Sequence, residues 1–541
     1  MMNSKVKKLA LAMSLALGGV GMVPSAQAVS VSADNLGQAL IFPYYTVRGG
    51  WLSLFGVVNT SNQVVAVKVR FHEAYNSRDV FDFNIILSPY DEWTGWLADS
   101  PNGPVMYTED KSCTVGDIFS AGSAGITFPA PVAYTGTATD GGPTTIDRMR
   151  EGYVEMIMMG ASPGTPAATY PLASGAIHVA GARPAGCAAL VSAFQNPSVL
   201  GTAAPCPVSP TGAVAGTTGT LRGEFCNYPS YVANSSTLPL NPLKGTFALV
   251  NGGEGFNAVG LPTALQNFRN STAMTLQLAP TNLTASTSSG SIVAYADSWH
   301  EPSMNSAGSP GVQLIPTSTA INTPVLTGTA LGVGAVSDAL MHTNVINEWS
   351  NRTNAAAGWV TATDWVLTFP TKGMYVDNDF SNQYAGRNQG RGNSGSTATT
   401  AVGSSPFAAF FVNSAPGPTV TKNGLSCDPM SFTLRNREEQ SSQGAGFSPG
   451  GTAQLCYETN VLTFNSGLIL NSPIAASINY PEAFTFGWLN IAMGGTTGLP
   501  VVGFSITSRD DSAGLLSEAG LVNHSYVPPT SLTLPYPPTA P

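Results

Sequence analysis

LGQALIFPYYTVRGGWLSLFGVVNTSNQVVAVKVRFHEAYNSRDVFDFNIILSPYDEWTGWL, residues 36 to 97, is the stretch that decides the fold class. Apolar and polar side chains alternate from residue 65 to 72, and residues 81 to 87 repeat the pattern, which is typical of strands with one buried face. The polar, turn-rich residues 73 to 78 between them predict an antiparallel hairpin. The outward side chains would be Lys68, Arg70, His72, Asp82 and Asn84. We therefore predict a mainly β chain of antiparallel, immunoglobulin-like β-sandwich units.

Further strand-like segments follow along the chain, separated by long loops rich in glycine, proline and serine. They span residues 150–160, 245–251, 291–299, 364–372, 407–412, 431–435, 460–464, 484–493 and 501–507. Short helices are expected to be few. One is predicted from Ser337 to Trp349, because Ser337 suits a helix N-cap and apolar residues recur after it at helical spacing.

The length of the chain suggests more than one domain. We expect a signal peptide at residues 1–28, an N-terminal β-sandwich at 29–160 and a loop-rich, disulfide-pinned connection at 161–242. A C-terminal β-rich region at 243–526 and a proline-rich tail at 527–541 would follow. The alternative is a single elaborated sandwich in which late strands pair with early ones.

The first 28 residues have the three parts of a secretory signal peptide: lysines at the start, a short apolar run, and the small-residue site Ala26-Gln27-Ala28. Removal of this segment and its three lysines would change the formal charge from −9 to −12. An acidic mature chain argues against nucleic acid or an anionic membrane as partner. We expect an exported protein at the cell surface or outside the cell, with the periplasm as a further possibility, and no transmembrane segment.

Six cysteines form an even set in a chain with an export signal, which predicts three disulfides. The pairing that we expect among the fifteen possible ones is Cys113 with Cys187, Cys206 with Cys226, and Cys427 with Cys456. No cysteine stands in a C-x-x-C pair or near a histidine at metal spacing, so zinc and haem are not expected.

Several residues are candidates for ligand binding. Tyr90, Trp93 and Trp96 could form an aromatic platform for a sugar ring, or they could belong to the core. Asp377 and Asp379 could donate oxygens to Ca²⁺, but the rest of a calcium loop is missing, and a turn is the better interpretation. We expect no metal and no cofactor.

Catalytic signatures are weak. Two segments match G-x-S-x-G, at 160–164 and 446–450, but both lie in glycine-rich turns without the strand and helix that a nucleophile elbow needs. Four acidic residues could supply the carboxylate pair of a glycosidase, or they could be structural, with Arg148 or Arg150 as partners of the last two. They are Asp91, Glu92, Glu151 and Glu155.

Five motifs together resemble a group of exported proteobacterial proteins usually called "cell surface protein". They are ALIFPYYTVRGG, VKVRFHEAYNSRDVFDFNIILSPYDEWTGW, MREGYVEMI, DWVLTFPTK and LRNREEQ. The resemblance implies export and a surface or periplasmic setting. It implies no catalytic residues.

Two functions follow as hypotheses. The first is a non-enzymatic cell-surface or extracellular β-protein with a structural, adhesive or ligand-binding role, whose partner could be a surface component, a glycan or a second copy of the chain. The second is a secreted glycan-active hydrolase with a pair of carboxylates, which would require two acids that face each other across an aromatic-lined groove.

Overall fold

The computed structural model describes residues 29–115, 118–129, 131, 134–135, 142–162, 164–165, 167–195, 224–225, 241–268, 333–352, 358–373, 411, 427–443, 453–464, 467–481, 484–493, 498–511 and 517–529. The predicted signal peptide, the segment 291–299, and most of the predicted strand 407–412 and of the tail lie outside these residues. So do Cys206, Cys226, Asp377 and Asp379.

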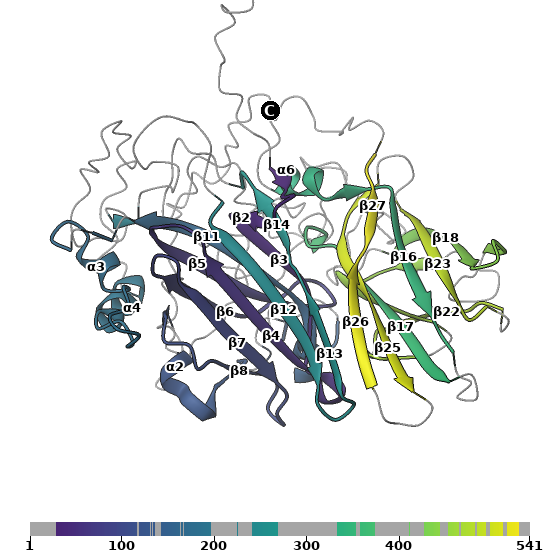
Figure 1. Cartoon of the computed structure of the whole chain (residues 1–541), viewed down its shortest axis with the longest axis horizontal. Helices are drawn as coiled ribbons and strands as arrows, with labels where there is room; N and C mark the ends of the chain where they lie inside the picture. The colour runs from purple at the N-terminus through teal and green to yellow at the C-terminus, as the bar shows by residue number, and fades with distance from the viewer. Residues whose placement is uncertain are drawn as a thin grey trace, which may run out of the picture.

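The fold is mainly β, with antiparallel sheets and few short helices, which confirms the predicted fold class (Figure 1). Two seven-stranded sheets form the N-terminal sandwich. Sheet A has the order β1 (Ser30–Val31), β14 (Thr263–Gln266), β3 (Ala39–Thr46), β11 (Glu151–Ser162), β5 (Val64–Glu73), β6 (Asp79–Leu87), β9 (Cys113–Val115). Sheet B has the order β10 (Ile126–Thr127), β8 (Val105–Tyr107), β7 (Glu92–Ala98), β4 (Leu52–Asn59), β12 (Leu243–Asn251), β13 (Phe256–Gly260), with β2 (Leu36–Gly37) also paired to β12.

Two further sheets form a C-terminal sandwich. Sheet C has the order β19 (Ser441–Gln443), β18 (Asp428–Asn436), β23 (Phe486–Met493), β16 (Asn344–Ser350), β27 (Ser525–Val527), with β20 (Ala453–Leu455) also on β18. Sheet D has the order β22 (Ala476–Ile478), β21 (Thr459–Phe464), β17 (Trp359–Thr368), β25 (Val502–Asp511), β26 (Ser517–Asn523). The short strands β15 (Met341–His342) and β24 (Leu499–Pro500) pair with each other.

Short helices lie outside the sheets. The α-helices are α2 (Ile118–Ala121), α3 (Pro171–Ser174), α4 (Cys187–Gln195) and α6 (Val333–Ala339). The 3₁₀ helices are η1 (Arg48–Gly50), η2 (Gly122–Ala124) and η4 (Ile146–Arg150).

The central strands β17, β21 and β25 of sheet D are buried on both faces, and this joins the two sandwiches. Val366, Val461 and Phe504 pack into the N-terminal core, whereas Trp365, Leu367 and other residues of the opposite face pack into the core of the C-terminal sandwich. Hydrogen bonds also cross the junction between the sandwiches. The backbone N–H of Thr459 donates to the carbonyl of Ala74 at 3.0 Å, and the side chain of Trp51 donates from Nε1 to the carbonyl of Ile469 at 3.0 Å.

The predicted boundary at residue 243 does not coincide with a change of sheet. Strand β12 pairs with β4 along its length, and β14 pairs with β3, so the residues from 243 to 266 complete the N-terminal sandwich. Late strands therefore do pair with early ones, as the alternative hypothesis required, while the strands from β16 onward form the second sandwich.

The predicted helix at 337–349 is wrong. Helix α6 ends at Ala339, and residues 344–350 form strand β16 between β23 and β27. Val345 and Trp349 are both buried, but residues four apart share a face in a strand as well as in a helix. The β-branched residues Thr343, Val345 and Ile346 favour the strand, and pairing on both sides decides it.

Candidate ligand-binding face

The three aromatic residues of the predicted platform do not come together. Trp93 is buried in the N-terminal core and contacts Phe83, with ring centroids 5.5 Å apart. Trp96 lies on the outer face of sheet B, while Tyr90 is 71% exposed in the turn before β7. Positions 93 and 96 are an odd number of residues apart, so one strand must send them to opposite faces. The prediction of a platform from all three is therefore wrong.

Trp96 instead belongs to a row that crosses sheet B. Strand register places Tyr107, Trp96, Leu54, Ala248 and Val259 as successive cross-strand neighbours on β8, β7, β4, β12 and β13. We call these five residues the sheet B row. At the usual spacing between neighbouring strands the row is about 19 Å long.

The sheet B row is apolar and open to solvent. Leu54 is 36% exposed and Val259 is 61% exposed, whereas Trp96, Tyr107 and Ala248 are partly buried. The rings of Trp96 and Tyr107 stack, with centroids 5.5 Å apart and planes 16° apart. A partly exposed apolar row of this kind on the outer face of a sheet is a candidate binding surface.

Neutral polar groups lie beside the row. Thr94 and Thr246 are exposed on either side of Gly56. A Cβ at position 56 would lie 2.9 Å from Thr246 Oγ1, so a larger residue would crowd Thr246, and with glycine no side chain stands on the sheet at this point. The nearest charged residues on the same face are Glu92 and Lys244. They pair with Val58, two residues beyond Gly56 along β4. The face therefore combines stacked aromatic rings with hydroxyl groups, and one carboxylate oxygen, Glu92 Oε1, lies beside the threonines, 3.5 Å from where a Cβ on Gly56 would be.

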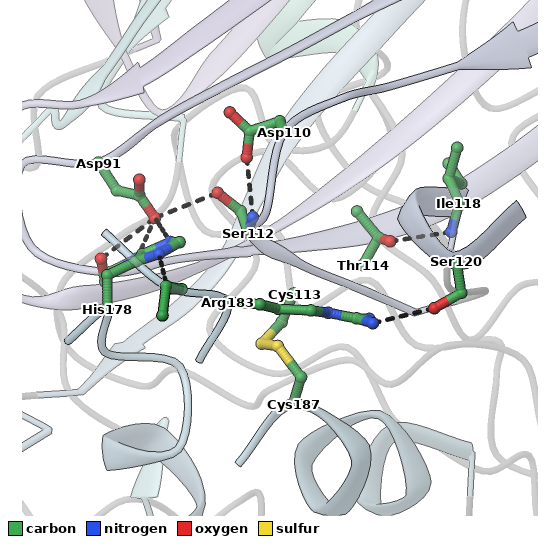
Figure 2. Close-up of a disulfide and its surroundings, with 12 residues drawn as sticks. Asp91, Asp110, Ser112, Cys113, Thr114, Ile118, Ser120, His178, Arg183 and Cys187 are labelled. Atoms are coloured by element: carbon green, nitrogen blue, oxygen red, sulfur yellow. Dashed lines mark hydrogen bonds and ion pairs between the residues drawn. A yellow bond between two sulfur atoms is a disulfide. The ribbon is translucent and has the colours of Figure 1, made fainter. Parts of the chain in front are cut away.

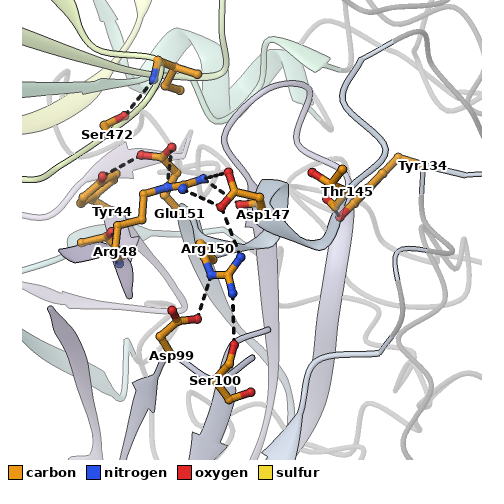
Figure 3. A network of polar contacts seen from close by, with 12 residues as sticks. Tyr44, Arg48, Asp99, Ser100, Tyr134, Thr145, Asp147, Arg150, Glu151 and Ser472 are labelled. Carbon is orange, nitrogen blue, oxygen red and sulfur yellow. Dashed lines mark hydrogen bonds and ion pairs between the residues drawn. The ribbon is translucent and has the colours of Figure 1, made fainter. Parts of the chain in front are cut away.

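Glu151 and Glu155 are structural in this fold. Four residues apart on β11, they are separated by about 13 Å of strand, beyond the spacing of about 5–10 Å in glycosidases. Glu151 accepts hydrogen bonds from Arg48 Nε at 3.1 Å and Tyr44 OH at 2.9 Å, and the same arginine binds Asp147 (Figure 3). Burial raises the pKa of Glu151, although Arg48 acts in the opposite direction.

The partners of these two acids differ from the prediction. Glu155 lies 3.5 Å from Nε2 of His72, and Arg48 is the cation of Glu151. Arg148 pairs with Glu73 at 2.8 Å, and Arg150 pairs with Asp99 at 2.8 Å. Distant segments supply the partners because β11 is central in sheet A, with β3 on one side and β5 on the other.

Asp91 and Glu92 do not form a catalytic pair either. Asp91 Oδ2 accepts bonds from Ser88 N at 2.9 Å and from Ser112 Oγ at 3.3 Å, and His178 Nε2 lies 3.4 Å away (Figure 2). Ser112 thus donates to the aspartate and not to the histidine that would have to activate it as a nucleophile. Glu92 points to the exposed face of β7.

The remaining sequence candidates also have structural surroundings. Ser162, in the first G-x-S-x-G segment, is buried and accepts a bond from Gly164 N at 3.3 Å, which is a turn. Ser448 and His300 lie outside the described part of the chain. Among the residues that the structure describes, no group of histidine, cysteine and acidic side chains is arranged to hold a metal ion.

Two of the predicted disulfides are present. Cys113–Cys187 ties β9 of sheet A to α4, and Cys427–Cys456 lies at the start of β18 (Figure 2 shows the first). Both are compatible with an oxidising compartment. Within the described ranges no helix is long and apolar enough to cross a membrane.

Comparison with known proteins adds no relative, since no family model, curated protein or solved structure matches this chain. The sheet B row was missed in the sequence because it joins residues as distant as Leu54 and Val259, and only strand register brings them side by side.

Proposed function

We propose that this chain is an exported, non-catalytic cell-surface or extracellular protein that binds a neutral glycan on the outer face of sheet B. The observation that carries the proposal is the sheet B row, with the Trp96–Tyr107 stack and exposed threonines beside it. The apolar face of a sugar ring packs on aromatic side chains while its hydroxyls bond to polar neighbours, and aromatic residues supply large contact area of this kind.

Charge favours a neutral ligand over an ionic one. Charged residues make up only 10% of the chain, and those nearest the row on the same face are one acid and one lysine. Export is supported by the sequence of residues 1–28 and is compatible with the two disulfides. The same setting is implied by the resemblance to exported surface proteins.

The glycan-active hydrolase is the weaker proposal. Each of the four acids that could have supplied its carboxylate pair is either bound by a structural partner or exposed on its own, as described above. Cleavage of a bound polysaccharide by the purified protein would revive this alternative.

Retention on insoluble neutral polysaccharides tests the binding proposal. The mature protein should be retained by at least one member of a panel of such polymers, and Trp96→Ala should lower the affinity at least tenfold. Trp488→Ala is the matched control, because Trp488 is a 38% exposed tryptophan on sheet C. The proposal fails if the wild type binds no polymer in the panel, or if both variants bind as the wild type does.

A test of location is separate. Fractionation of the native host into medium, outer membrane and periplasm should recover the mature protein without residues 1–28. A cytoplasmic protein that keeps this segment would contradict export.

A further inference from the structure

A lysine and two carboxylates meet deep in the junction between the sandwiches. Lys372 follows β17, Asp428 begins β18, and Glu458 immediately precedes β21. All three residues are at least 97% buried. Lys372 Nζ lies 3.2 Å from Asp428 Oδ2. Such burial is unusual for a lysine and an acid, and ion pairs at this depth gain little net stability over apolar packing.

Burial disfavours the charge of the Lys372 ammonium, whereas the neighbouring rings and carboxylates favour it. Phe369 and Phe411 flank Nζ, with ring centroids 5.4 and 5.5 Å away. Burial lowers the pKa of Lys372, against the opposing effect of Asp428 and Glu458. Nζ also donates to the carbonyls of Leu455 and Cys456, both at 3.2 Å. The carbonyl of Tyr457 accepts a third, longer bond at 3.5 Å, which a neutral amine with two N–H groups would give up.

We propose that Lys372 and Asp428 condense after folding to form an intramolecular amide bond between the two side chains. Transfer of one proton from the ammonium to the carboxylate first gives the amine and the carboxylic acid. Nζ then attacks Cγ of Asp428, the C–N bond forms, the bond from Cγ to the hydroxyl oxygen breaks, and water leaves with one proton from nitrogen. The reaction is a condensation and needs neither oxidant nor reductant.

In this scheme Glu458 relays that proton, although its charge by itself raises the pKa of Lys372. Its carboxylate contributes to the electrostatic field at Lys372, and its Oε1 lies 3.1 Å from the position that a Cβ on Gly373 would occupy. Its other oxygen, Oε2, accepts a bond from Ser77 Oγ at 3.0 Å, which connects the carboxylate to the N-terminal sandwich. Folding of both sandwiches would therefore assemble the reacting groups.

A second buried lysine–aspartate pair gives an internal comparison. Lys68 contacts Asp82 on the outer face of sheet A, but this pair lies among further charges, since Lys68, Asp82, Arg70 and His72 all act on Asp79. Opposite charges nearby favour the ionised forms of such groups. We expect the Lys68–Asp82 pair to remain ionic.

Mass spectrometry of the mature, fully reduced protein tests the proposal. The expected mass is lower than the sequence mass by one water molecule, and a protease digest should yield one branched peptide that joins Lys372 to Asp428. A wild-type mass equal to the sequence mass would overturn the proposal, and so would a branched peptide at Lys68 in place of Lys372.

Variants separate the chemistry from folding. Lys372→Met should have its full sequence mass, and Glu458→Gln should slow the loss of water at least tenfold after refolding. Ser77→Ala is the control for Glu458→Gln, because it removes the hydrogen bond to Glu458 and leaves the carboxylate in place. If Glu458→Gln folds, as judged by near-UV circular dichroism, and loses water at the wild-type rate, the role of Glu458 is refuted.

Discussion

The outer face of sheet A carries charged side chains and is buried, whereas the outer face of sheet B carries apolar side chains and is partly exposed. On sheet A, Lys68, Arg70 and Glu155 are each no more than 2% exposed. On sheet B, Leu54 and Val259 are open to solvent. The sequence prediction that the polar residues of β5 point away from the core between the two sheets is right, but the expectation that they are exposed is wrong.

The difference lies in what packs over each face. At one end of sheet A, α3 and α4 cover Val64, Ala66 and their neighbours, and at the other end α6 covers Ile41 and Ile157. The charged residues lie between these two apolar clusters and pair with one another across β5, β6 and β11. Period-two alternation thus identifies the two faces of a strand, but not which elements come back to cover them.

The largest expected effect comes from breaking the charged face. Arg70 donates from Nε to Asp79 Oδ2 at 2.9 Å, and both side chains are almost fully buried. Arg70→Met leaves the Asp79 carboxylate without this partner, so we expect the free energy of unfolding to fall by about 3–5 kcal/mol in urea titrations at pH 7.

Removal of both charges is the control for this variant. The double variant Arg70→Met with Asp79→Leu should recover most of the lost stability, because no uncompensated charge remains. If Arg70→Met costs less than about 1 kcal/mol, the charged face is hydrated and not a buried ionic cluster, and the contrast with sheet B disappears.

Local pattern was sufficient to predict several of the longer strands. Strands β5, β6, β11, β12 and β25 fall where the alternating or continuous apolar segments placed them. The helix at 337–349 failed because a spacing of four residues fits both periodicities and because two partner strands outweigh an N-cap signal.

The candidate site could be predicted only in part. Trp96 was identified from its residue type. It lies three residues from Trp93, an odd number, which would have shown that the two side chains point to opposite faces of one strand. Ala248 and Val259 are unremarkable residues in the sequence, and they join Trp96 only through the pairing of β12 with β4 and β13. The ionic partners, such as Arg48 for Glu151, are likewise set by tertiary contacts between distant segments.

An intermediate effect is expected from pH on the charged face. Burial disfavours the charged imidazole of His72, but Glu155 and Asp79 outweigh both burial and Arg70, so the pKa of His72 is raised. A group whose pKa is higher in the folded state stabilises the protein fully below its unfolded pKa of about 6.5, and this contribution disappears as the pH rises through the folded pKa. His72→Gln should therefore cost more stability at pH 6 than at pH 8.

A buried histidine of the other sandwich provides the control. The imidazole of His524 bonds to Asn347 and to the Val366 carbonyl, and burial lowers its pKa to about 3. Its contribution has the opposite sign, since it is complete above pH 6.5 and is lost as the pH falls. The cost of His524→Gln should therefore decrease below pH 6. Equal costs of His72→Gln at pH 6 and pH 8 would show that folding does not raise the pKa of His72.

The smallest effect on stability is expected on the face of sheet B, where the effect on binding should be largest. Val259→Lys introduces a charge at an exposed position of the sheet B row, so the free energy of unfolding should change by no more than about 0.5 kcal/mol. Val522→Lys is the matched control, because Val522 is a 60% exposed valine on β26 of sheet D. Both variants should unfold as the wild type does in urea, and only Val259→Lys should lose retention on the polysaccharide that the wild type binds.

A loss of several kcal/mol in Val259→Lys would mean that the face is covered in solution, most simply by a second copy of the chain, which sedimentation of the wild type would reveal. Equal retention of both lysine variants would place the ligand elsewhere and leave the sheet B row as an exposed apolar surface without a role in binding.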